Sequence, residues 1–145
     1  MPVGGDAGPT SQANPALLHW FLGIGLVLVV AALVTARQMG IGTGDADASM
    51  RTVGYALAAV SFVQAAVALL LLKPRVRARG PGQSPAQYWA DRNVAAAAFR
   101  VWFLIEGAGI IAAVGYFLSG VPTAAALAGL SAAVFWLNGP RAFEK

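Results

Sequence analysis

One long apolar stretch of the sequence, residues 100–118 (RVWFLIEGAGIIAAVGYFL), carries an acidic and a basic side chain. A hydrocarbon core about 30 Å thick is crossed by about 20 apolar residues in a helix, so this stretch is long enough to span a bilayer. A charged residue near the middle of such a helix costs roughly 2.5 to 3.5 kcal/mol. Glu106 therefore needs a partner, a proton or a role in ion movement. Arg100 is expected to extend its guanidinium back to the lipid headgroups.

Two polar residues in other apolar segments could lie at the depth of Glu106. Gln64 lies eight residues before Leu72, the expected end of its helix, and Ser131 lies seven residues before Asn138. Glu106 lies about 9 Å along its helix from Arg100. We predict a buried polar cluster of Glu106, Gln64 and Ser131, because lipid offers polar groups no other partner. Six residues turn a helix by about 600°, equivalent to about 240°, so Arg100 does not share a face with Glu106.

The composition indicates a membrane protein. Of the 145 residues, 58% are hydrophobic and 11% charged, whereas soluble domains average about 45–50% and about 25%. The absence of cysteine excludes disulfides, thiolate metal sites and cysteine nucleophiles, and the single histidine excludes a bis-histidine haem within one chain. No nucleophile with a base and no set of metal ligands can be assembled, so we expect neither catalysis nor a metal site.

The residue pattern predicts an all-α fold, a bundle of four transmembrane helices arranged as two hairpins. Residues 1–14 are rich in Gly and Pro and are predicted to form a flexible tail. Asn14 and Pro15 are good N-cap and first helical residues, and no basic residue precedes Arg37, so we expect an uncleaved first helix. The expected spans are about 15–36, 52–72, 94–118 and 122–138, all within one membrane domain, 15–138. The stop signal Asn138-Gly139-Pro140 leaves a short tail, 139–145.

Two loops show further local signals. Ser84 and Gln87 form a capping-box pattern with Pro85 between them, so we predict a helix that begins at Pro85 and continues unbroken into the third span. Asp45 and Asp47, before the second span, could be a metal pair or helix caps, and we favour caps.

Half of the basic side chains lie in the loop 73–93. They are Lys73, Arg75, Arg77, Arg79 and Arg92. No soluble domain is present to build a groove for nucleic acid, so we expect these side chains to contact lipid headgroups. With four spans, seven Lys/Arg fall on the side of this loop and of both termini, against two in the opposite loops. The positive-inside rule makes that side cytoplasmic and predicts a multi-pass protein of the inner (cytoplasmic) membrane.

Rows of small residues at spacing four predict close helix packing. Gly109 and Ala113 form one row in the third span. The fourth span carries two, Ala124/Ala128/Ala132 and Ala125/Gly129/Ala133. Such rows let helix backbones approach closely. The sequence leaves open whether the packed helices belong to this chain or to a partner.

The run from Arg100 through Leu104-Ile105-Glu106 to Gly115-Tyr116-Phe117-Leu118 resembles the carboxylate-bearing helix of the ATP synthase proteolipid (c) subunit. In that family the intramembrane acid takes up and releases the translocated ion, so the resemblance implies that Glu106 would be that acid. The four-span layout as a whole resembles small bacterial four-helix membrane proteins with a similar acid in the third helix. That likeness implies a fold but no activity.

Three functions remain open. The first is a non-catalytic accessory or assembly subunit of a larger membrane complex, such as a respiratory or photosynthetic one. It is favoured by the small size and the packing faces, and its partners would be the lipid bilayer and other membrane subunits, with no nucleic acid. The second is a proton or cation carrier that uses Glu106. The third is a binder of a pigment, quinone or small ligand through His19, although a lone histidine beside Trp20 at the interface is more often structural.

Overall fold

The computed structural model describes residues 14–41 and 47–145, and within these ranges the chain is helical with no strand. Three helical segments are long and apolar enough to cross a membrane. They are α1 (Pro15–Gln38), the segment Ala48–Arg75 and α4 (Arg92–Ser119). The fourth apolar helix, α5 (Pro122–Leu137), has 16 residues. It is therefore only about 24 Å long and falls short of a typical hydrocarbon core.

The segment Ala48–Arg75 changes its winding towards its end. It begins as α2 (Ala48–Ala66), widens into the π-helical turn η1 (Val67–Leu72) and tightens into the 3-10 turn η2 (Lys73–Arg75). Pro74 has no backbone N–H, so an α-helix cannot continue through it with full hydrogen bonding. The change in winding therefore coincides with the point where the chain leaves the apolar stretch.

The predicted helix caps are present at the starts of α1 and α2. The Asn14 side chain accepts hydrogen bonds from Ala16 N and Leu17 N, and Pro15 is the first helical residue. Asp47 accepts a hydrogen bond from Met50 N at 2.9 Å and another from the Ser49 hydroxyl, and these bonds lower the pKa of Asp47. Asp47 is therefore a cap. Asp45 lies outside the described residues, which contain no group of three side chains able to hold a metal ion.

The helix that begins at Pro85 does not run unbroken into the next helix, contrary to the prediction. The capping box forms, with Gln87 N donating to Ser84 Oγ, but α3 (Pro85–Ala90) has only six residues. Asp91 then adopts an extended conformation, and its side chain accepts a hydrogen bond from Asn93 N at 2.8 Å. Because the aspartate satisfies an N–H that would otherwise lack a partner, a second helix can start there in a new direction.

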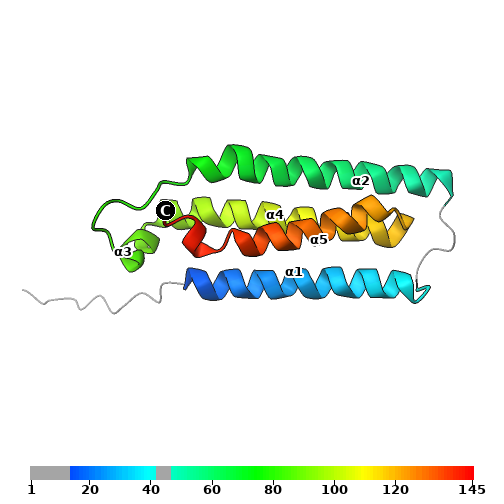
Figure 1. The fold of residues 1–145 in the computed structure, drawn as a ribbon, viewed down its shortest axis with the longest axis horizontal. Helices are drawn as coiled ribbons and strands as arrows, with labels where there is room; N and C mark the ends of the chain where they lie inside the picture. The colour runs from blue at the N-terminus through cyan, green and yellow to red at the C-terminus, as the bar shows by residue number, and fades with distance from the viewer. Residues whose placement is uncertain (1–13, 42–46) are drawn as a thin grey trace, which may run out of the picture.

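The long helices lie side by side, and α4 contacts α1, α2 and α5 (Figure 1). The beginning of α1, the short helix α3 and the C-terminal residues lie at one end, while the end of α1, the beginning of α2 and the turn between α4 and α5 lie at the other. We call the first of these the basic end, because the loop from Lys73 to Arg92 and residues 138–145 lie there. The first described residues and the C-terminus therefore lie at the same end.

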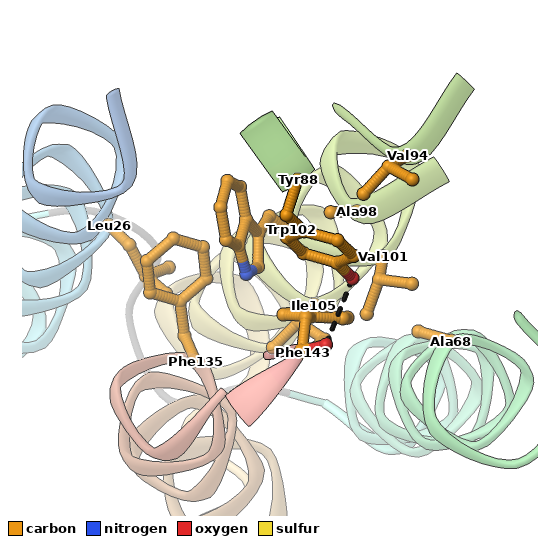
Figure 2. Close-up of a cluster of buried hydrophobic side chains, with 10 residues drawn as sticks. All are labelled: Leu26, Ala68, Tyr88, Val94, Ala98, Val101, Trp102, Ile105, Phe135 and Phe143. Atoms are coloured by element: carbon orange, nitrogen blue, oxygen red, sulfur yellow. Dashed lines mark hydrogen bonds between the residues drawn. The ribbon is translucent and has the colours of Figure 1, made fainter. Parts of the chain in front are cut away.

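The largest buried side chains lie between the basic end and the middle of the helices. Trp102 and Ile105 on α4, Leu26 on α1 and Phe135 on α5 are fully buried (Figure 2). Phe143, from the segment predicted to be a free tail, packs into the same cluster and is 5% exposed. The C-terminal residues therefore fold back over the ends of the helices through the short 3-10 turn η3 (Pro140–Ala142).

The two small-residue rows of α5 have different surroundings. Ala124 and Ala128 are fully buried, and Ala128 packs with Ala112 and Ala113 of α4. In the other row Gly129 is exposed, and a Cβ added there would meet no atom within 4 Å. One row therefore packs helices of this chain against each other, while the other remains on the surface.

Candidate functional site

The carboxyl end of α5 is satisfied by side chains from three other elements. The last carbonyls of a helix have no partner within the helix and must find donors elsewhere. Here Asn138 Nδ2 donates to Val134 O at 2.7 Å, and Trp102 Nε1 donates to Asn138 O at 2.6 Å. Lys73 and His19 also contact this end of α5. We call Lys73, His19, Trp102, Phe135 and Asn138 the α5 end cluster. The cluster ties α1, α4 and the start of η2 to the point where α5 stops.

Lys73 contacts this cluster and does not simply extend into the headgroups. Its ammonium donates to Asn138 Oδ1 at 2.6 Å and lies 6.0 Å from the centre of the Phe143 ring. A cation near the carboxyl end of a helix is also favoured by the helix dipole. The sequence grouped Lys73 with the arginines of its loop, but its hydrogen bond gives it a structural role.

We expect Lys73→Met to lower the free energy of unfolding by about 1.5 to 3 kcal/mol, because Asn138 Oδ1 loses a charged hydrogen-bond donor. Methionine keeps the apolar part of the side chain, so the loss reports on the ammonium. Arg79→Met is the matched control, since Arg79 is exposed in the same loop. That variant should change stability by less than about 0.5 kcal/mol. Unfolding by SDS in mixed micelles measures both, and equal small losses would show that Lys73 is only another headgroup contact.

His19 is held in one orientation by the same helix end. It is 3% exposed, and its Nε2 lies 3.1 Å from Phe135 O. A carbonyl oxygen can only accept, so Nε2 carries the proton, and in the neutral ring Nδ1 is an acceptor. The ring stacks on Phe135, with centroids 4.5 Å apart, and meets Trp102 edge-on at 5.0 Å. His19 is the fifth residue of α1, and its side chain is buried among these rings.

A cavity of about 630 Å³ lies beside His19 at the basic end. Apolar and aromatic walls come from Trp20, Trp136 and Pro85, and two charged side chains, Arg141 and Glu144, also line it. Its volume is within the range of small-molecule sites. An axial ligand role for His19 would have to use Nδ1, because Nε2 is engaged with Phe135 O.

The polar cluster predicted from depth does not form through hydrogen bonds between its members. Gln64 Nε2 donates to Leu104 O at 3.1 Å, and Ser131 lies against Gly109. Both therefore meet α4 at the level of Glu106. The described residues offer the Glu106 carboxylate no hydrogen-bond partner or ion pair.

The reason lies in the rotation of α4. A Cβ added at Gly107 would meet Gln64 of α2, and one added at Gly109 would meet Leu26 of α1. Glu106 precedes Gly109 by three residues, so it lies about 60° from the α1 side of α4, and it lies about 100° from Gly107. Glu106 is half-buried on that flank, and Gln64 approaches α4 from another side.

The remaining predicted residues lie near the basic end. Arg75, Arg77, Arg79, Arg92 and Arg100 are all exposed there. The backbone carbonyl of Arg77 lies 2.8 Å from the Tyr88 hydroxyl, which is also 2.9 Å from Phe143 O (Figure 2). Burial of Tyr88 and the nearby Glu144 carboxylate raise the pKa of that hydroxyl. Tyr88 therefore stays neutral and donates one proton between two carbonyls, which fixes the basic loop to the C-terminal segment.

The sequence did not reveal that Trp102 and Asn138 are central to the α5 end cluster. Trp102 was an apolar residue among others, and Asn138 was only a stop signal. One feature of the sequence could have paired Asn138 with Lys73. A lysine that ends one apolar helix and an asparagine that ends another, at the same side of the membrane, are at a depth where they can meet.

Comparisons with protein-family models, with curated protein sequences and with solved structures each found no match for this chain. Its function must therefore follow from the geometry of its own residues.

Proposed function

We propose that this chain is a four-span inner-membrane protein that serves as a non-catalytic accessory or assembly subunit of a larger membrane complex. Large apolar side chains on the outward faces of the helices, including Phe21, Leu28, Phe62 and Leu70, are exposed. Lipid or another membrane protein is the natural surrounding for such a surface. The 16 residues of α5 would be accommodated as a fourth span by local thinning of the bilayer.

The distribution of basic residues supports an orientation with both termini in the cytoplasm. The arginines of the loop from Lys73 to Arg92, together with Arg141 and Lys145, belong to the basic end, while Arg37 and Arg51 belong to the other. Cytoplasmic segments of membrane proteins carry the excess of Lys and Arg. The basic end is therefore proposed as the cytoplasmic one.

Glu106 is the observation that carries the subunit role. It is the fifteenth of the 28 residues of α4, so it lies near mid-depth, and it is half-buried on the flank towards α1. The described residues give it no polar partner, whereas every buried side-chain nitrogen or oxygen among them has one. A carboxylate left open to lipid at this depth is costly. A polar or basic side chain of a neighbouring subunit would remove that cost.

The test is purification of the tagged chain from its own host in native nanodiscs, with mass spectrometry of proteins recovered at fixed stoichiometry. We expect one defined complex with the unmodified chain and at least a tenfold loss of partner with Glu106→Leu, because a charged pair in lipid has no substitute. Gln64→Leu is the matched control, since Gln64 bonds within the chain. Recovery of the chain alone, or equal recovery with both variants, would contradict the subunit role.

A second candidate, a proton or cation carrier, uses the same carboxylate. Its mid-depth position is where an ion would bind during transport. Proteoliposomes that contain the chain alone distinguish the two, because a carrier would show an ion flux that Glu106→Gln abolishes. An accessory subunit would show none with either chain.

A further inference from the structure

The cavity beside His19 offers an acceptor that no other described residue uses. Every buried side-chain nitrogen or oxygen in the described residues has a hydrogen-bond partner. His19 Nδ1 has none, so it must reach the surface even though the side chain is 97% buried. The Cε1–Nδ1 edge of the ring faces Gly139, because a Cβ added there would lie 3.5 Å from Cε1 and 3.8 Å from Nδ1. His19 and Gly139 both line the cavity, so this edge of the ring lies at its wall.

Two charged residues line the cavity, the acidic Glu144 and the basic Arg141. Glu144 accepts a hydrogen bond from Trp89 Nε1 through one oxygen, at 2.9 Å, which leaves its other oxygen as an acceptor. Arg141 is exposed and brings a guanidinium suited to phosphate. The site thus presents two acceptors, Nδ1 and a carboxylate, beside one cationic donor.

Trp20 and Trp136 add an amphipathic wall. Their rings meet edge-on with centroids 4.7 Å apart, and Leu137 beside them is exposed. The cavity lies at the beginning of α1, in the same turns of that helix as the exposed apolar side chains of Leu17 and Phe21. Tryptophan at such a position is typical of the level of lipid headgroups. A ligand could therefore place its head in the cavity and its tail along α1.

We propose that this cavity binds the headgroup of phosphatidylethanolamine. The primary ammonium has three N–H donors, which match His19 Nδ1 and the free oxygen of Glu144, and the phosphate matches Arg141. Phosphatidylcholine has the same net charge but no N–H donor, so it would leave both acceptors unpaired. This inference rests on the membrane location of the chain and not on its role as a subunit.

The test measures quenching of tryptophan fluorescence by trace brominated lipid in phosphatidylcholine vesicles that contain the chain. We expect brominated phosphatidylethanolamine to bind about tenfold more tightly than brominated phosphatidylcholine, since charge-assisted hydrogen bonds separate the two headgroups. Brominated phosphatidylglycerol is included to detect a general preference for anionic lipid. Free phosphoethanolamine is added as a competitor, and we expect it to displace little of the lipid because it lacks the tail.

Two variants separate the site from the bulk charge of the basic end. Glu144→Gln keeps an oxygen for Trp89 Nε1 but loses the carboxylate. His19→Gln keeps an N–H that can reach Phe135 O but replaces the fixed ring acceptor with an amide oxygen on a flexible side chain. Each should reduce the preference at least threefold. Arg92→Gln, an exposed residue outside the cavity, should leave it unchanged. If His19→Gln fails to fold, Glu144→Gln still decides.

Equal binding of the two zwitterionic lipids would overturn the inference, as would a preference that survives Glu144→Gln or is larger for phosphatidylglycerol. Complete displacement by phosphoethanolamine would overturn the assignment to a lipid. Failure of the chain to float with the vesicles would instead contradict the membrane location.

Discussion

Trp102→Ala should lower the free energy of unfolding by about 3 to 5 kcal/mol, the range for removal of a large aromatic side chain from a core. Trp102 is fully buried and contacts the rings of His19, Phe99, Trp89 and Phe143. Its Nε1 also donates to Asn138 O, so the substitution removes a hydrogen bond at the end of α5. Because Trp102 lies in the packed interior, water cannot readily replace that donor.

The measurement is unfolding of the purified chain by SDS in mixed micelles, followed by far-UV circular dichroism. Trp102→Phe keeps most of the ring volume and should cost about 1 to 3 kcal/mol, the cost of an unpaired buried carbonyl. Phe103→Ala, next along α4, is the matched control because Phe103 is 57% exposed. If Trp102→Ala and Phe103→Ala had similar effects, the α5 end cluster could not be the core of the chain.

Gly54→Leu should separate α2 from α4 and cost about 3 kcal/mol, the upper end of the usual range for overpacking. A Cβ added at Gly54 would collide with Ser119 Oγ and lie 2.5 Å from Ser119 Cβ. The Ser119 side chain cannot easily move, because its hydroxyl donates to Gly115 O and accepts from Val121 N at the turn into α5. The collision therefore falls on the backbone separation of the two helices.

Gly25→Leu is the matched control for that variant. Gly25 is also within an apolar helix, but a Cβ added there would meet no atom within 4 Å. Its free energy of unfolding in the same SDS titration should not fall, because glycine in a helix interior is less favourable than other residues by up to about 1 kcal/mol. Equal losses at Gly25 and Gly54 would mean that the cost comes from glycine replacement in general and not from close packing of α2 on α4.

Local signals in the sequence were enough to place the starts of two helices. Asn14 with Pro15, and Ser84 with Gln87, cap helices as predicted, because a cap depends on contacts within about three residues. The same local reasoning failed at Asp91, where a helix and a capped start are both compatible with the residues. Which of them forms depends on the burial of Tyr88 and Trp89 against distant segments, which short-range patterns do not contain.

The partners of the polar residues could not be predicted in the same way. Counting residues from the helix ends gave the depth of Gln64 and Ser131 in the bundle, and both contact α4 near the level of Glu106. The direction in which each side chain points could not be predicted, because it depends on how each helix is rotated about its axis. Nearly all-round apolar helices lack the polar face from which that rotation is usually read. Close approaches at glycines, such as Gly109 against Leu26, set the rotation in the folded chain.

By itself, the sequence determined an all-helical chain with helices apolar enough for a membrane, the caps of several of them, and the isolation of one carboxylate in an apolar helix. Only the tertiary structure decided that Lys73 bonds to Asn138, that the His19 ring lies at the wall of a cavity, and that the C-terminal residues pack over the helix ends. The physical reason is range. Hydropathy and capping act over a few residues, whereas these contacts join residues 41 or more positions apart, and packing of whole helices brings them together.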